Sequence, residues 1–174
     1  MMILNREEMR RTVMRLSMEM IEKNKGTDGL VLVGIRPRGL ILAKKMQREI
    51  ERIEGVLLPL GALDIVRHRA DLTEHEREAQ FAGSEMDFSL DGKNVALIDD
   101  IMFTGRTVRA AVSALFELGN PATVRLYTLI DRGHRELPFR PDSAGKTVPT
   151  SSEESVKVRF LETDGEDCVV LTRK

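Results

Sequence analysis

The chain has 174 residues, of which 41% are hydrophobic and 32% charged, and its formal net charge is −1. This composition is typical of a single globular domain and excludes a disordered chain. No apolar run approaches the roughly 20 residues of a membrane-spanning helix, and the N-terminus matches no signal or transit peptide. With a single cysteine, Cys168, there is no intramolecular disulfide. We therefore expect a cytoplasmic protein, and the balanced charge neither indicates nor excludes a nucleic-acid partner.

The first half of the chain alternates helical and strand patterns. Asn5 is suited to cap a helix that runs to about Asn24, and Lys25 and Gly26 end it. Residues 29–35 form an apolar run that predicts a buried strand, followed by a second helix over 39–53 and a strand over 56–66. Residues 67–90 lose this periodicity and are mostly polar, which predicts a mobile flap outside the core.

The second half continues the alternation. The segment that begins at Val95 predicts a buried strand and then a helix to Leu118, and residues 123–130 predict another strand. Residues 131–155 are polar, whereas 156–161 and 167–171 alternate like an antiparallel pair. We predict an α/β fold in one domain over residues 1–174, with a central parallel sheet flanked by helices, a flap and a small C-terminal antiparallel ribbon.

The most informative segment, residues 95–107, reads Val-Ala-Leu-Ile-Asp-Asp-Ile-Met-Phe-Thr-Gly-Arg-Thr. It places two carboxylates, Asp99 and Asp100, at the end of a buried strand, where ligands of parallel sheets bind. The following turn suits a phosphate, because Gly105 permits close backbone approach and the threonines offer hydroxyls at a helix start. The carboxylates suit sugar hydroxyls or a Mg²⁺ ion that arrives with a phosphorylated ligand. The segment therefore predicts a sugar-phosphate site.

A second anion site is predicted at the loop after the first buried strand. This loop consists of Arg36, Pro37, Arg38 and Gly39. Two arginines and a glycine at a helix start are suited to hold an anion.

These motifs resemble those of the type I phosphoribosyltransferases, which bind phosphoribosyl pyrophosphate. The resemblance implies that the residues of the turn, Thr104, Gly105, Arg106 and Thr107, bind phosphate and that the loop at 36–39 takes pyrophosphate. Where the family usually has a small hydroxyl residue, this loop has Pro37, which loses one side-chain donor. Asp99 and Asp100 would act in catalysis together with Arg69 of the flap, and Mg²⁺ would be the cofactor, bound directly or indirectly by the two acids.

A closer resemblance covers almost the whole chain. Segments 22–26, 63–65, 131–140, 145–146 and 148–151 are similar to those of the bifunctional pyrimidine-operon attenuation regulators with uracil phosphoribosyltransferase activity. This implies synthesis of UMP from uracil, binding of leader mRNA in response to UMP or UTP, and self-association. Arg132 and Val156 would bind the nucleobase. The implied RNA-binding residues are Arg15, Lys23, His134, Arg135, Arg140, Lys146 and Thr150.

Several departures keep alternatives open. Met14 and Met18 stand where the regulators often have polar residues, which favours a uracil enzyme that has lost RNA binding. Pro37, and His68 and Ala70 in the flap, favour instead a nucleotide-sensing regulator with negligible catalysis. A purine or orotate enzyme of the same fold is disfavoured by residues 131–140.

Overall fold

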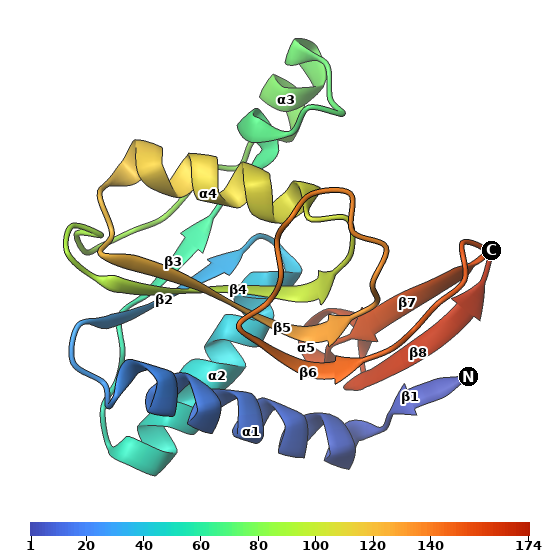
Figure 1. Cartoon of the computed structure of the whole chain (residues 1–174), viewed down its shortest axis with the longest axis horizontal. Coiled ribbons are helices and arrows are strands. Elements are labelled where there is room, and N and C mark those ends of the chain that lie inside the picture. Colours follow the sequence, from blue (N-terminus) through green and yellow to red (C-terminus); the bar gives the residue numbers. More distant parts are fainter.

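The computed structural model describes all 174 residues and contains a central five-stranded parallel sheet (Figure 1). Its strands are β2 (Leu30–Ile35), β3 (Leu60–Leu63), β4 (Asn94–Met102), β5 (Thr123–Asp131) and β6 (Ser143–Thr147). They lie in the order β3-β2-β4-β5-β6, so β4 is the middle strand. The apolar run of β4 is buried because the sheet is covered on both faces.

Helices α1 (Arg6–Asn24) and α2 (Arg38–Glu54) cover one face of this sheet, and α4 (Arg106–Leu118) covers the other (Figure 1). Each face has its own hydrophobic core cluster. The predicted boundaries of α1 are confirmed: Asn5 and Glu8 form a capping box, and Lys25 ends the helix in the left-handed conformation. None of the helices is sufficiently long and apolar to cross a membrane.

A smaller antiparallel sheet lies at the edge of the molecule that carries both termini (Figure 1). It contains β1 (Met2–Leu4), β8 (Cys168–Arg173) and β7 (Glu154–Arg159) in that order, with the short α5 (Leu161–Asp164) between the last two along the chain. The β7–β8 pair is the predicted ribbon, and β1 is an addition that the sequence patterns did not indicate.

The predicted strand over 56–66 is wrong in its extent, since only Leu60–Leu63 pair as β3. Val56 and Leu57 are exposed and therefore gain nothing from the sheet. The polar segment 131–155 contains β6, which pairs along the edge of β5.

The flap contains a 3-10 turn, η1 (Val66–His68), and a helix, α3 (Glu74–Gln80), that projects beyond α4 (Figure 1). Its predicted end at residue 90 is too late, because Leu90 is 2% exposed and belongs to the core beneath α4. Buried Asp64 fastens the base of the flap, since its carboxylate accepts hydrogen bonds from the backbone N–H groups of Val66, Ala82 and Gly83.

Candidate active site

The acid pair lies at the carboxyl end of β4, where the strand lies between β2 and β5. Asp99 is 9% exposed, and its Oδ1 accepts a hydrogen bond of 2.9 Å from the backbone N–H of Asp100. Burial raises the pKa of the Asp99 carboxyl well above its ordinary value, and the charge of Asp100 raises it further. Burial also raises the pKa of Asp100. A cation or a hydroxyl donor bound here would compensate for the lost hydration of these carboxylates.

The turn after β4 begins α4 without a side-chain hydrogen bond from its N-cap residue. Gly105, with a φ of 95°, is the N-cap residue and offers no side chain to cap the helix. The Thr104 hydroxyl accepts a hydrogen bond of 3.2 Å from the backbone N–H of Arg106. The Arg106 side chain pairs with Glu136 at 2.9 Å, and both are exposed. The backbone geometry therefore has the form of an anion-binding helix start.

A cavity of about 630 Å³ brings this turn and the flap together. Its lining residues are His68, Arg69, Ala70, Asp71, Phe103, Thr104, Arg106, Thr107, Arg109 and Leu137. The Arg69 guanidinium is held by Asp71 through a contact of 2.6 Å between Nη2 and Oδ2. The predicted flap arginine and the predicted phosphate turn thus line one space, although residues 68–71 and 103–109 come from different parts of the chain.

The loop between β2 and α2 lies directly beside the acid pair. A Cβ atom on Gly39 would lie 2.4 Å from the Ile98 carbonyl oxygen and 3.2 Å from Asp99 Oδ1, so only glycine fits. Arg36 extends towards the flap, where its Nη2 lies 3.2 Å from Glu85 Oε1, while its Nε is buried without a hydrogen-bond partner. The loop therefore places Gly39, which is buried, directly against the end of β4 at Asp99.

The Arg38 side chain turns away from the loop and towards the small sheet. Its Nε lies 3.4 Å from Asp100 Oδ2, and its Nη2 lies 2.8 Å from Asp164 Oδ2. Nη2 also donates to the Val158 carbonyl, and the guanidinium lies over the Phe160 ring. The sequence reasoning missed Asp164 as a partner, because 126 residues separate it from Arg38 and no local spacing connects them.

Arg132 and Val156 lie on neighbouring buried elements at the end of β5 and on β7. Arg132 donates to the Glu154 carbonyl at 2.7 Å, and its guanidinium lies 4.1 Å from the centroid of the Phe103 ring. The Phe103 ring is 40% exposed and faces the cavity that contains Thr104. The Arg132 guanidinium and the Phe103 ring therefore form a stack, of a kind that suits a flat heterocycle.

Comparisons with known proteins show the family of the chain. Residues 1–163 match the family model described as phosphoribosyl transferase domain. The bifunctional protein PyrR of Pelotomaculum thermopropionicum is 52% identical over 97% of this chain and 93% of its own length. The chain belongs to the PyrR family. The predicted family, the phosphoribosyltransferase assignment and the bifunctional class are thereby confirmed.

Other relatives extend the comparison. The bifunctional protein PyrR of Thermus aquaticus is 50% identical over 99% of this chain and 95% of that protein. Among solved structures, a hypoxanthine phosphoribosyltransferase of Trypanosoma cruzi is similar with a TM-score of 0.73 and 17% identity, covering 99% of this chain and 95% of that chain. A second structure of that enzyme gives a TM-score of 0.76 at 19% identity, with 99% and 91% covered. These two structures confirm the predicted fold.

The residues predicted for RNA in this PyrR-family chain lie on α1, on β6 and in the segments that follow β5 and β6. Arg15 of α1 donates to the Gly145 carbonyl of β6, and Lys146 Nζ lies 3.4 Å from the Ile3 carbonyl oxygen, so these two lie where α1 meets the late segment. Lys23 is exposed near the end of α1. Arg140 is exposed and makes no hydrogen bond or ion pair.

The remaining three predicted RNA residues, His134, Arg135 and Thr150, lie close to Arg132. His134 Nε2 lies 2.6 Å from the Thr150 carbonyl oxygen, and the Thr150 hydroxyl lies 3.2 Å from Arg132 Nε. Arg135 is held by Asp131 at 2.6 Å, and its side chain is only 17% exposed. Asp131, which holds Arg135, pairs with Thr147 on β6, directly after Lys146, so Arg135 and Lys146 are connected through the β5–β6 pair.

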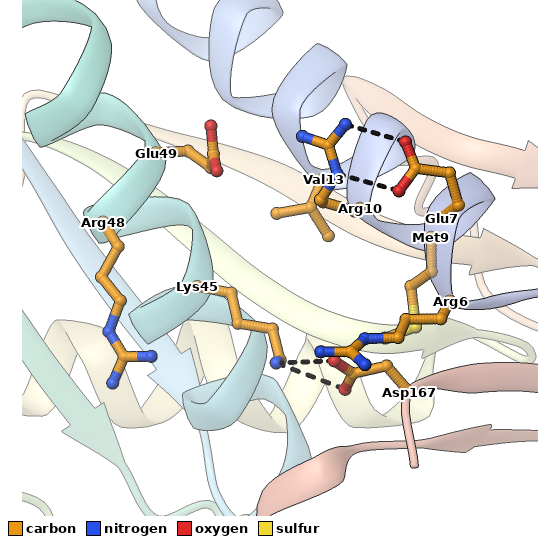
Figure 2. A pocket seen from close by; sticks show the side chains of 9 residues that line it. All are labelled: Arg6, Glu7, Met9, Arg10, Val13, Lys45, Arg48, Glu49 and Asp167. Carbon is orange, nitrogen blue, oxygen red and sulfur yellow. Dashed lines mark hydrogen bonds and ion pairs between the residues drawn. The ribbon is translucent and has the colours of Figure 1, made fainter.

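A second cavity, of about 260 Å³, lies between α1, α2 and the start of β8 (Figure 2). None of the predicted site residues lines it. Two ion pairs lie within it, Arg10 with Glu7 and Lys45 with Asp167, as Figure 2 shows. We therefore do not assign it to the transferase site.

Proposed function

We propose that this chain transfers the phosphoribosyl group of phosphoribosyl pyrophosphate to a ring nitrogen of uracil, giving UMP and pyrophosphate. The observation that supports this most strongly is the buried pair of Asp99 and Asp100 beside the uncapped, glycine-led start of α4. The choice of uracil rests on the resemblance of residues 131–140 and 148–151 to the attenuation regulators.

In this proposal the donor is held at both ends. Residues 104–107 bind its 5′-phosphate through the open N–H groups of α4 and through the threonine hydroxyls. Asp99 and Asp100 bind the ribose hydroxyls. The backbone of the loop at 36–39 holds the pyrophosphate, and Arg69 closes over it from the flap side of the cavity. As the bond between the anomeric carbon and the pyrophosphate oxygen lengthens, positive charge develops on the ribose and the carboxylates stabilise it.

Mg²⁺ fits this site as an ion that arrives with the donor. The two carboxylates are oxygen ligands of the kind that Mg²⁺ prefers, and no cluster of three Asp, Glu, His or Cys residues completes a protein cage. Asp99 and Asp100 would hold the ion directly or through water. When bound, it would spread the negative charge of the leaving pyrophosphate.

The acceptor site is formed by Arg132, Val156 and the ring of Phe103. The backbone of Val156 in β7 offers a carbonyl and an N–H group to the polar edge of uracil. The side chain of Arg132 is fixed by Glu154 and Phe103, so it can face the base without a large loss of side-chain entropy.

The test of this activity is an assay with phosphoribosyl pyrophosphate, Mg²⁺ and one base at a time: uracil, hypoxanthine or orotate. The proposal expects UMP from uracil and little product from the other two. Product from hypoxanthine or orotate alone would show a purine or orotate enzyme of the same fold. No product at high enzyme concentration would leave only a nucleotide-sensing regulator.

We also propose that the chain binds pyrimidine-operon leader mRNA in response to UMP or UTP. Support comes from the meeting of α1 and β6 at Arg15 and Lys146, and from the free guanidinium of Arg140. A gel shift with a leader stem-loop, with and without UMP, tests it. No shift at low salt would identify a uracil enzyme without RNA binding, which the exposed Met18 of α1 favours. The same apolar side chain supports self-association, which sedimentation velocity would detect.

A further inference from the structure

The Arg38 guanidinium connects the acid pair with the small antiparallel sheet. Its contact with Asp100 is on β4, where the proposed function places the ribose. Its contacts with Val158 and Asp164 are on β7 and on α5, which directly follows that strand. Val156, which the proposed function places at the base, lies two residues before Val158 on the same strand. One side chain therefore bridges the two halves of the reaction site.

We propose that Arg38 is a positioning residue, which fixes β7 and the following turn against Asp100 and so sets the separation of the two substrates. This inference rests on the proposed function. It differs from the role that the sequence resemblance implies, in which Arg38 contacts pyrophosphate.

The contacts of Arg38 argue against its release to a ligand. Asp100 is largely buried, with a side chain 13% exposed, and Arg38 is its one cationic partner. Moving the guanidinium towards pyrophosphate would remove from Asp100 its one cationic partner within the chain and would also free the Val158 carbonyl. An arginine can serve several acceptors at once because its donors form a rigid planar fork.

Asp164 is fixed on the other side of the bridge. Its Oδ2 accepts hydrogen bonds from the backbone N–H of Phe160 at 2.8 Å and from the Thr163 hydroxyl at 3.0 Å. These contacts and Arg38 lower the pKa of its carboxyl to about 2, the Phe160 bond contributing most. Asp164 is thus an ionised anchor within its own turn, and Arg38 is its link to the acid pair.

Lys45 provides a matched control in the same region. Its ammonium lies 3.1 Å from Glu162 and 3.3 Å from Asp167, and like Arg38 it lies over the Phe160 ring. It therefore ties α2 to the same turn, as Figure 2 shows for Asp167. Lys45 makes no contact with Asp100, so its loss should loosen the turn without releasing the acid pair.

The experiment compares Arg38→Gln, Asp164→Asn, their double variant and Lys45→Gln in the full chain, with thermal melts to confirm folding. Because small misplacements of reacting groups cost up to roughly 100-fold in rate, we expect Arg38→Gln and Asp164→Asn each to lower kcat for UMP formation by about tenfold or more. KM for phosphoribosyl pyrophosphate should stay within about twofold. The double variant should be no slower than Arg38→Gln, since Asp164 acts through Arg38. Lys45→Gln should keep kcat.

Three results would overturn the inference. A raised KM for phosphoribosyl pyrophosphate with unchanged kcat in Arg38→Gln would identify a pyrophosphate ligand. If the losses in kcat of the two single variants multiply in the double variant, or if Lys45→Gln loses as much kcat as Arg38→Gln, the effect is a general loosening of the turn around α5. If the unmodified chain makes no UMP, that result refutes the proposed function but not the bridge by Arg38. Hydrogen exchange then tests the bridge separately. Asp164→Asn should then speed exchange in the peptide containing Asp100 while Lys45→Gln does not, and equal exchange would refute the bridge.

Discussion

Replacing Gly39 by alanine should disable the transferase while leaving the fold largely intact. The added Cβ would lie 2.4 Å from the Ile98 carbonyl oxygen, whereas real Cβ atoms essentially never come within 3.0 Å of such a neighbour. The start of α2 must therefore retreat from β4 by at least about 0.6 Å, the difference between those two distances. The obstacle is backbone, so no side-chain rotation can relieve the contact.

This retreat has two measurable consequences. Overpacking of this kind costs about 1–3 kcal/mol of folding free energy. The loop at 36–39 would move away from Asp99, and a misplacement approaching 1 Å costs up to roughly 100-fold in rate. We expect kcat/KM for UMP formation to fall by about 10- to 100-fold in Gly39→Ala.

The assay is steady-state UMP formation together with urea denaturation of the same samples. Gly55→Ala is the matched control, because Gly55 ends the same helix at a φ of 69° with no atom near its Cβ position. That change should cost about 1–2 kcal/mol through backbone strain without altering turnover. Unchanged kcat/KM in Gly39→Ala would refute the reasoning, as would an equal loss in Gly55→Ala.

Other substitutions test other parts of the account. Asp99→Asn should lower turnover by orders of magnitude yet raise the free energy of unfolding at neutral pH. Burial raises the pKa of this carboxyl above 3.8, so the unmodified chain loses stability as pH rises from 3.8 through the raised pKa. Urea titrations should therefore show that the variant and the unmodified chain differ less in free energy of unfolding at acid pH than at neutral pH. Equal free energies of unfolding at every pH would contradict this. Asp64→Ala removes the acceptor of three backbone N–H groups, which should cost about 1–3 kcal/mol and speed hydrogen exchange over residues 66–83; unchanged exchange there would refute the anchor. Arg140→Ala should reduce the salt-dependence slope of RNA binding by about one unit, and an unchanged slope would exclude a phosphate contact. Arg135→Ala should instead lower stability, because it leaves Asp131 unpaired; an unchanged melting temperature would argue against that.

The parts of the fold that the sequence predicted are those with strong local patterns. The middle strand β4 has an uninterrupted apolar run because both its faces are buried, and that run ends at the acid pair. α1 has a capping residue at one end and a left-handed residue at the other. Such signals lie within a few residues of one another, so they can be read from the sequence without the structure.

The parts that were missed depend on distant partners. β6 reads Ser-Ala-Gly-Lys-Thr, and only its pairing with β5 makes it a strand. β1 has three residues and exists through its pairing with β8, at the other end of the chain. Leu90 looks like the end of a polar segment, yet it packs beneath α4.

The candidate site shows the same division. The motifs located the acid pair, the phosphate turn and the pyrophosphate loop, because each is continuous in sequence. They did not indicate where the arginine side chains point. Arg38 faces Asp164 and Arg135 faces Asp131, and only the folded chain shows that these guanidinium groups are already paired.

The most direct test of the account is a crystal structure with phosphoribosyl pyrophosphate and Mg²⁺. The account predicts the 5′-phosphate on residues 104–107 and the ribose hydroxyls at Asp99 and Asp100, directly or through the metal. Clear density for the donor elsewhere, with the start of α4 and the two carboxylates free of ligand, would contradict it.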